Sequence, residues 1–349
     1  MPLYRVVHRL RFVYPRIATE AVLRAVGARR ALVVMYHRVV DAPSDTFGVN
    51  ITPTHFAEQL EVLRRSGRPI HLTELARTLA GGRVPDRAIV VTIDDGYADS
   101  FETAKPILER YGIPATVFVT TGHVGGPELW WGRLERMLLQ PGVLPDTLSL
   151  LIRGRTQTWH LNGAANLGEE EHRRHRQWAV THENPPSDRH RLFHQLYTLL
   201  YRLTPAERAD VLGQLHAWSD VCPEPRPEHR GLSPDELVAL ADTPLVEIGA
   251  HSVTHPALDR VPASVQRDEI FGARAFLEEI LDRRVESFAY PHGRYTAETR
   301  KLVKEAGFSC ACTAQPGSVW RRTDPLRIPR TYAPDEDGDS FARRLRRWL

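Results

Sequence analysis

The sequence has few cysteines, little net charge and no long hydrophobic run. Three cysteines in 349 residues are too few for a disulfide scaffold. The longest apolar runs, such as residues 31–36 and 88–91, are far shorter than the ~20 residues that cross a membrane. Arginines interrupt the N-terminal residues, where a signal peptide would need an apolar stretch. We therefore expect a cytoplasmic protein without a transmembrane segment or a disulfide framework.

The charge is nearly balanced overall but unevenly distributed. The formal net charge is +3, which argues against a nucleic-acid-binding protein that acts through bulk charge. Residues 1–40 contain eight arginines and a single acidic residue, Glu20. The apolar spacing of residues 1–30 predicts a basic amphipathic helix, either docked on the protein or in peripheral contact with the anionic inner face of a membrane. Residues 336–349 are a second basic segment, which we interpret as a C-terminal tail.

From residue 31 onward, short β-branched runs alternate with helical patterns, which predicts parallel strands joined by right-handed crossovers. Seven runs are expected to form strands: 31–36, 88–93, 115–119, 245–249, 286–290, 308–313 and 326–328. Residues 127–231 break this alternation, and we predict a mostly helical inserted subdomain with one small hairpin. Residues 31–126 and 232–335 then form a single α/β barrel, whose site is expected at the C-terminal ends of its strands.

Ionisable side chains follow the predicted strands directly. Two adjacent carboxylates, Asp94 and Asp95, follow the second strand, and two histidines, His251 and His255, follow the fourth. Asp95 and the two histidines would give a divalent metal three ligands and leave one position open, as in catalytic zinc sites. We expect Zn²⁺, with Co²⁺, Ni²⁺ and Mn²⁺ as alternatives, because the spacing does not choose among these metals.

Three motifs, in this order, resemble those of the polysaccharide deacetylases, which are the NodB-homology or carbohydrate esterase family 4 enzymes. Residues 92–97, Thr-Ile-Asp-Asp-Gly-Tyr, resemble the T-F-D-D-G motif of that family. Residues 251–255, His-Ser-Val-Thr-His, resemble its H-[ST]-x-x-H motif, and residues 289–293, Ala-Tyr-Pro-His-Gly, resemble its third motif. The resemblance covers residues 31–126 and 232–335, but neither the N-terminal segment nor the insertion.

The resemblance implies a distorted (β/α)7 barrel, here with a mostly helical insertion, that hydrolyses the acetamide of sugars such as N-acetylglucosamine. It implies that Asp95, His251 and His255 hold the metal and that Asp94 is the general base on the attacking water. These roles are physically coherent, since a cation polarises the acetyl carbonyl and a neighbouring carboxylate can accept the proton of the water. The backbone N–H of His292 matches the family's oxyanion donor.

The sequence departs from the commoner family pattern at two positions. The third motif usually begins with an arginine that braces the base, but this sequence has Ala289 there, and Arg330 is a candidate substitute. Many members carry a general-acid histidine near the C-terminus, but no histidine follows His292. Some exopolysaccharide deacetylases carry this histidine on the first strand, where this sequence has His37. We therefore predict His37 as the general acid, with His292 as the alternative.

Aromatic and basic residues near the motifs are candidates for binding the substrate. They are Tyr97, Tyr290, Arg330, Trp130 and Trp131. The two tryptophans begin the insertion, and they either stack on sugar rings or pin the insertion to the barrel. The predicted function is removal of the N-acetyl group from a polysaccharide, a nascent glycan or a lipid-linked glycan. The alternatives are a hydrolase of another non-peptide C–N bond and a non-catalytic glycan- or lipid-binding protein, because a fold does not specify a substrate.

Overall fold

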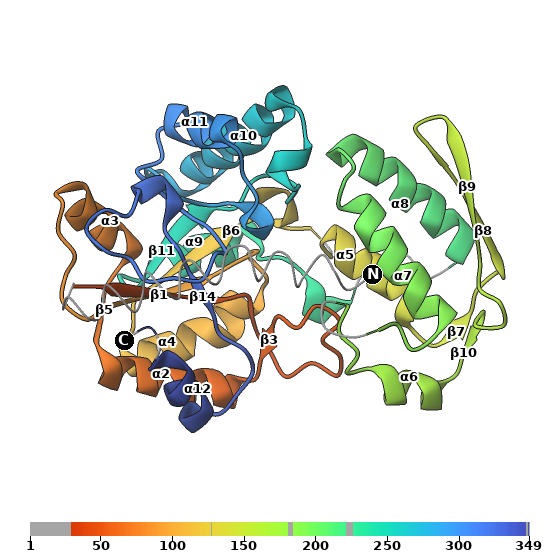
Figure 1. Ribbon diagram of the computed structural model, residues 1–349, viewed down its shortest axis with the longest axis horizontal. Coiled ribbons are helices and arrows are strands. Elements are labelled where there is room, and N and C mark those ends of the chain that lie inside the picture. Colours follow the sequence, from red (N-terminus) through yellow and green to blue (C-terminus); the bar gives the residue numbers. More distant parts are fainter. Residues whose placement is uncertain (1–28, 127, 181–183, 221–225, 347, 349) are drawn as a thin grey trace.

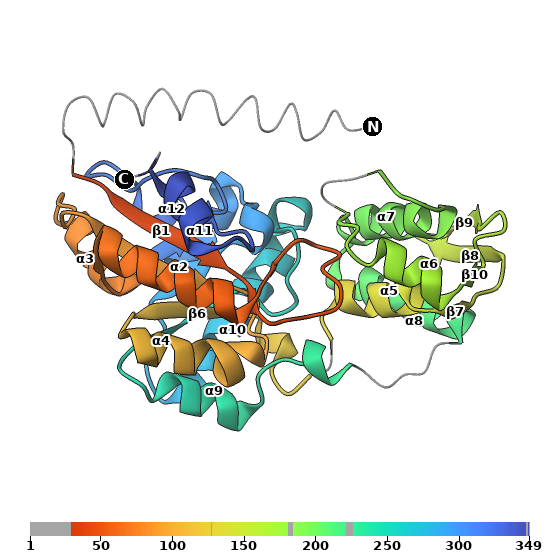
Figure 2. The same cartoon turned by 90° about the horizontal axis from the view of Figure 1, so that it is seen from below.

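The computed structural model describes residues 29–126, 128–180, 184–220, 226–346 and 348. It shows two lobes: one is built on a parallel sheet, and the other is formed by the inserted segment (Figures 1 and 2). The helix predicted within residues 1–30 lies outside the described residues, apart from Arg29 and Arg30. Among the described residues, no helix is long and apolar enough to cross a membrane.

The first lobe is organised around an eight-stranded parallel sheet. In spatial order its strands are β13 (Cys310–Cys312), β12 (Ser287–Ala289), β11 (Val246–Ala250), β6 (Ala115–Val119), β5 (Ala88–Ile93), β1 (Ala31–Tyr36) and β14 (Thr331–Tyr332), and β4 (Arg68–Pro69) pairs with β5. Ile328 forms a parallel bridge with Cys312 of β13, and Thr331 pairs with Val34 of β1. One segment therefore joins the two ends of the sheet, which gives the distorted (β/α) barrel that the sequence predicts.

Of the seven predicted strands, the last, at residues 326–328, is wrong. The other predicted strands are confirmed as β1, β5, β6, β11, β12 and β13. Residues Pro325–Arg327 instead form a 3-10 turn, η6, and the strand β14 follows it. Pro325 and Pro329 flank the predicted run, and a proline has no N–H to donate to a ladder.

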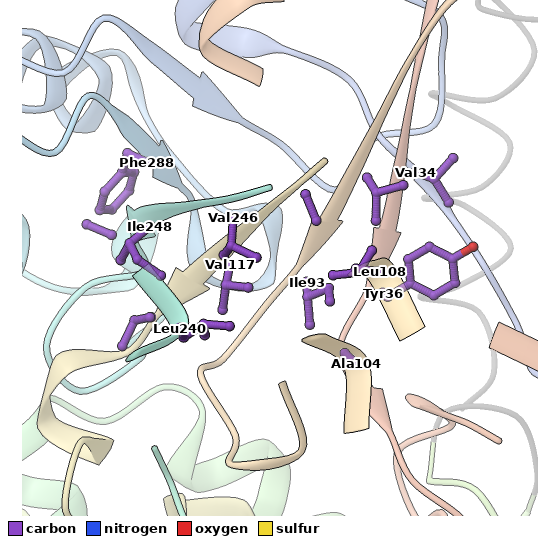
Figure 3. Packing of buried hydrophobic residues seen from close by; sticks show 14 of the residues in the cluster. Val34, Tyr36, Ile93, Ala104, Leu108, Val117, Leu240, Val246, Ile248 and Phe288 are labelled. Atoms are coloured by element: carbon purple, nitrogen blue, oxygen red, sulfur yellow. The ribbon is translucent and has the colours of Figure 1, made fainter. Parts of the chain in front are cut away.

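Helices surround the sheet and turn apolar faces toward it. They are α2 (Pro53–Ser66), α3 (Leu72–Ala80), the π-helical turn η1 (Ser100–Ala104), α4 (Lys105–Tyr111), α9 (Pro234–Ala241), α10 (Ala263–Leu281), α11 (Ala297–Glu305) and α12 (Gly338–Leu345). Hydroxyl side chains of Thr52, Ser233 and Thr296 accept backbone N–H groups and begin three of these helices. Figure 3 shows strand residues such as Ile93 and helix residues such as Leu108 in the same core.

The predicted basic tail contains a helix. Asp337 accepts the N–H of Ser340 and begins α12, which packs against α2. Phe341 and Leu345 are buried, whereas Arg343 is exposed. The segment is therefore amphipathic, and its apolar face belongs to the barrel core.

The insertion folds around a hydrophobic core of its own. Its elements are α5 (Trp130–Leu139), β7 (Gly142–Val143), β8 (Thr147–Ile152), β9 (Arg155–His160), β10 (Asn166–Leu167), α6 (Glu169–His175), α7 (Asp188–Leu200), α8 (Pro205–Ser219) and the 3-10 turn η3 (Pro227–His229). Strands β8 and β9 form an antiparallel hairpin. Helix α7 begins at Asp188, because the Ser187 side chain caps it.

Buried ion pairs hold the two ends of the insertion together. Arg226, near the end of the insertion, lies 2.8 Å from Glu128 and 2.9 Å from Glu135. Arg136 on α5 lies 3.1 Å from the second oxygen of Glu128. The start and the end of the insertion therefore leave the barrel at one place, next to the C-terminal ends of the strands.

Candidate active site

The three motifs meet at the C-terminal ends of the barrel strands. Asp94 and Asp95 directly follow β5, and His251 directly follows β11. His292 lies after β12, in the 3-10 turn η5 (Pro291–Gly293). These four residues line one cavity of about 160 Å³. Parallel strands bring their carboxyl ends to one edge of a sheet, so the spatial order β12-β11-β6-β5 brings the motifs together.

Asp95, His251 and His255 form a compact group that could hold a metal ion. One ligand atom from each residue lies within 4.8 Å of the other two. Asp95 Oδ1 lies 3.3 Å from His255 Nε2 and 3.6 Å from His251 Nε2, and the two Nε2 atoms are 3.1 Å apart. All three residues are buried. Within the part of the chain that the structure describes, this is the one group of this kind.

The donor atoms of this group suit a divalent cation. His251 Nδ1 lies 2.8 Å from the carbonyl oxygen of Ala289, and an N–H donated to this oxygen leaves Nε2 with a lone pair. Burial lowers the pKa of His251 to about 4, so its imidazole is neutral at neutral pH. Asp95 Oδ1 is buried and has no hydrogen-bond partner among the described residues. A carboxylate oxygen and two imidazole nitrogens are the ligand types of catalytic zinc sites.

Arg330 forms a bidentate ion pair with Asp94, with N–O distances of 2.6 and 2.7 Å. Its Nε also donates to the carbonyl oxygen of Thr313 at 3.0 Å, and its Nη1 donates to the hydroxyl oxygen of Thr92 at 3.1 Å. Burial by itself raises the pKa of Asp94, but the charge and hydrogen bonds of Arg330, together with the charges of His251 and His37, hold this pKa below its ordinary value. Asp94 is therefore ionised at neutral pH. These bonds fit the predicted bracing of Asp94 by Arg330, which also lines the cavity, and its contact with substrate stays a prediction.

Both candidate general acids, His37 and His292, line the cavity. His37 follows β1, which pairs with β5, the strand that precedes Asp94. The ring centroid of His292 lies 4.4 Å from that of His255. His37 Nδ1 and His292 Nε2 are buried, and neither has a hydrogen-bond partner in the described part of the chain. The site therefore contains two histidines that could exchange a proton with a substrate.

The four aromatic residues that the sequence predicts as substrate contacts divide into two pairs. Trp131 and Tyr290 line the cavity, whereas Tyr97 and Trp130 do not. Trp131 Nε1 donates a hydrogen bond of 3.0 Å to the hydroxyl oxygen of Tyr97. Trp130 stacks on Tyr197, with 5.3 Å between the ring centroids. Trp130 therefore packs within the insertion, whereas Trp131 bonds Tyr97 of the barrel and forms a wall of the cavity.

Two further aromatic residues line the cavity but lie outside the motifs. Phe47 precedes β3 (Asn50–Ile51), which pairs with β2 (Arg38–Val39), and Tyr197 lies on α7 of the insertion. Their ring centroids are 5.5 Å apart. Neither residue carries a sequence signal, because each reaches the cavity only through the packing of the insertion on the barrel.

Comparison with known proteins agrees with the geometry. The family model "Polysaccharide deacetylase" matches residues 81–144 and 211–311, which contain all three motifs. A poly-beta-1,6-N-acetyl-D-glucosamine N-deacetylase of Staphylococcus aureus (strain MSSA476) is 31% identical over 108 residues, which cover 27% of this chain and 37% of the relative. The enzyme of the same name from Escherichia coli (strain K12) is 30% identical over 84 residues, 24% of this chain and 12% of the relative. The matched stretches thus span only a minor part of these relatives.

Solved structures show the same fold over most of the chain. The structure of IcaB from Ammonifex degensii is 19% identical, with a TM-score of 0.56 over 90% of this chain and 96% of that one. The Streptococcus pyogenes deacetylase PplD is 18% identical, with a TM-score of 0.52 over 90% of this chain and 98% of that one. The family match, the motifs at the strand ends and this fold agree with one another, and all three are similar to those of the polysaccharide deacetylases.

Proposed function

We propose that this protein is a metal-dependent hydrolase that removes the acetyl group from an N-acetylated sugar in a polysaccharide or another glycan. The observation that carries this proposal is the grouping of Asp95, His251 and His255 beside the ionised Asp94 in one cavity. The match to the polysaccharide deacetylase model supports it, and the curated relatives are named as N-deacetylases of poly-β-1,6-N-acetyl-D-glucosamine. This polymer is therefore the first substrate to test.

In the proposed reaction, water cleaves the amide bond to give acetate and a free amine. Asp95, His251 and His255 would hold a divalent cation, which would supply a Lewis acid for the acetyl carbonyl. Asp94 accepts the proton of the attacking water, and Arg330 keeps this carboxylate ionised and oriented. A histidine donates a proton to the departing nitrogen. We propose His37 for this step, because it lines the cavity, lies outside the metal-ligand group and follows β1, the strand that pairs with β5.

Two finer parts of the proposal concern the identity of the metal and the place where the enzyme meets its substrate. We propose Zn²⁺, since three protein ligands with an open position are typical of catalytic zinc, and Co²⁺, Ni²⁺ and Mn²⁺ are alternatives. We also propose a lipid-linked or membrane-associated glycan, met on the cytoplasmic face of a membrane. This idea is supported by the arginine-rich residues 1–40 in the sequence and by Arg343, Arg344 and Arg346, which are exposed around α12.

Metal analysis and acetate release test the proposed function. We expect the purified protein to carry a divalent ion and to release acetate from poly-β-1,6-N-acetyl-D-glucosamine or from a lipid-linked N-acetylated sugar. A chelator should abolish this activity and added Zn²⁺ should restore it. Metal binding without acetate release from any N-acetylated sugar would favour hydrolysis of another C–N bond. Glycan binding without metal binding would favour a non-catalytic binding protein.

The His37→Ala variant tests the assignment of the general acid. We expect unchanged metal content and a turnover number lower by roughly 10²–10⁴-fold, which is what general acid catalysis typically contributes. The reason is that His37 lines the cavity but lies outside the metal-ligand group. His292→Ala is the matched variant, assayed for metal content and turnover in parallel. Full turnover in His37→Ala together with loss in His292→Ala would assign the step to His292.

A further inference from the structure

The loop that carries two of the three metal-ligand residues has a strained backbone. Ser252 has a φ of 64° and His255 has a φ of 54°, which are unusual for residues other than glycine. Such conformations persist only where surrounding contacts enforce them. Within the loop, the N–H of His255 donates to the Ser252 hydroxyl oxygen at 3.0 Å. The contacts made by the rest of residues 251–255 therefore decide where His255 points.

The barrel supplies contacts to the first half of this loop. The N–H of Thr121 donates to the carbonyl oxygen of Ser252 at 3.1 Å, and the N–H of Gly122 donates to that of Val253 at 2.8 Å. Thr121 and Gly122 belong to the 3-10 turn η2 (Thr121–His123), which follows β6. These bonds tie the loop to the neighbouring strand of the sheet.

Glu269, on helix α10 of the barrel, holds the N–H groups of the loop. Its carboxylate accepts the N–H of Val253 at 2.8 Å, the N–H of Thr254 at 2.7 Å and the hydroxyl of Thr254 at 2.6 Å. Glu269 is itself only 4% exposed. The donors in the middle of the loop are thus satisfied by the barrel.

The insertion contacts the carbonyl oxygen of Thr254, the residue that precedes His255. Arg208, on α8, donates from Nη1 to the carbonyl oxygen of Thr254 at 3.2 Å. Its Nε and Nη2 donate to the carbonyl oxygens of Leu200 and Leu203, at 3.3 and 3.4 Å, so the same guanidinium caps the end of α7. Its carbon Cζ lies 4.7 Å from the centroid of the Trp130 ring, and the residue is 3% exposed. Arg208 therefore connects the insertion core to the residue next to His255.

We infer that Arg208 is a positioning residue through which the insertion holds His255 in its metal-binding orientation. The planar guanidinium presents several donors in fixed directions, so it can bond the end of α7 and the loop at once. The ring of Trp131, also from the insertion, lies 4.7 Å from the ring of His255 and supports it from another side. The inference rests on the proposed function, since it concerns the proposed metal site. Residue 208 lies outside the ranges matched by the family model, so this support belongs to the insertion.

The test compares Arg208→Met with Arg189→Met. Arg189 is a matched control, because it is also buried in the insertion, at 2% exposure, and bonds only backbone carbonyl oxygens in the contacts described. Its acceptors are those of Leu138, Gln140, Gly142 and Ala165, all within the insertion. Zn²⁺ affinity is measured by competition with a chromophoric chelator, and the melting temperature is measured on the same samples. Loss of a partner that orients a ligand typically weakens metal binding by roughly 10–100-fold.

We expect Arg208→Met to bind Zn²⁺ about tenfold more weakly than the unchanged protein, and Arg189→Met to lower the melting temperature without this loss. Arg208→Lys should restore part of the affinity. If Arg208→Met does not fold, Arg208→Lys and Arg189→Lys give the same comparison. Equal Zn²⁺ affinity in the Arg208 variant and the unchanged protein, or equal losses in both arginine variants, would overturn the inference. Failure of the unchanged protein to bind any divalent metal would instead overturn the proposed function, and the inference with it.

Discussion

The His251→Ala variant is expected to lose both metal binding and hydrolysis. His251 Nε2 is one of only three ligand atoms in the group, and its Nδ1 is held by the carbonyl oxygen of Ala289. Its removal leaves Asp95 and His255, which is too few for a stable catalytic site of this type. Metal affinity should fall by more than the roughly 100-fold that loss of an orienting hydrogen-bond partner can cost. The measurements are metal content after dialysis and acetate release at saturating substrate.

His194→Ala is the control for this experiment. His190 and His194 have the same spacing as His251 and His255, but they lie on α7 of the insertion, and His194 is exposed. We expect this variant to keep its metal and its activity. Retention of metal and activity in His251→Ala would contradict the assignment of the metal site, since the variant lacks one of the three ligand residues of the group.

The Arg330→Met variant is expected to lose both stability and activity. Asp94 and Arg330 are 2% and 1% exposed, so removal of the guanidinium leaves a buried carboxylate without its charged partner. Breaking a buried ion pair in this way typically costs about 3–5 kcal/mol. Burial, no longer offset by Arg330, would raise the pKa of Asp94 and remove the proton acceptor from the reaction. Activity should then fall by roughly 10²–10⁴-fold, which is the usual contribution of a general base.

The double variant Arg330→Met/Asp94→Asn separates the two effects. It removes both charges, so the free energy of unfolding, measured with urea, should recover part of the loss seen in Arg330→Met. Activity should not recover, because the amide that replaces the Asp94 carboxylate cannot accept the proton. An Arg330→Met variant with unchanged stability and activity would refute the bracing role. Recovery of activity in the double variant would refute the role of Asp94 as the base.

Local sequence patterns were sufficient for six of the barrel strands and for the candidate metal-ligand group. Runs such as Ala88–Ile93 are β-branched and apolar, and the motif residues follow them directly, so chain position alone puts them at a strand end. The two-residue strand β14 was missed, because a pattern of period two cannot be read from two residues beside a proline. The strand that was wrongly predicted at residues 326–328 is also a short run, and Pro325 and Pro329 flank it.

The geometry of contacts between segments that are far apart in the sequence could be described only from the folded structure. Arg330 reaches Asp94 across 236 positions, and Arg208 reaches the Thr254 carbonyl across 46. No local pattern in the sequence distinguishes Arg208 from the other arginines of the insertion, and Phe47 and Tyr197 resemble ordinary core aromatics. The reason is physical: propensity and periodicity act over a few neighbouring residues, whereas closure of the barrel and docking of the insertion choose the partners of a side chain. The sequence therefore determined the candidate ligand group and the proposed base, and the tertiary structure decided how they are held.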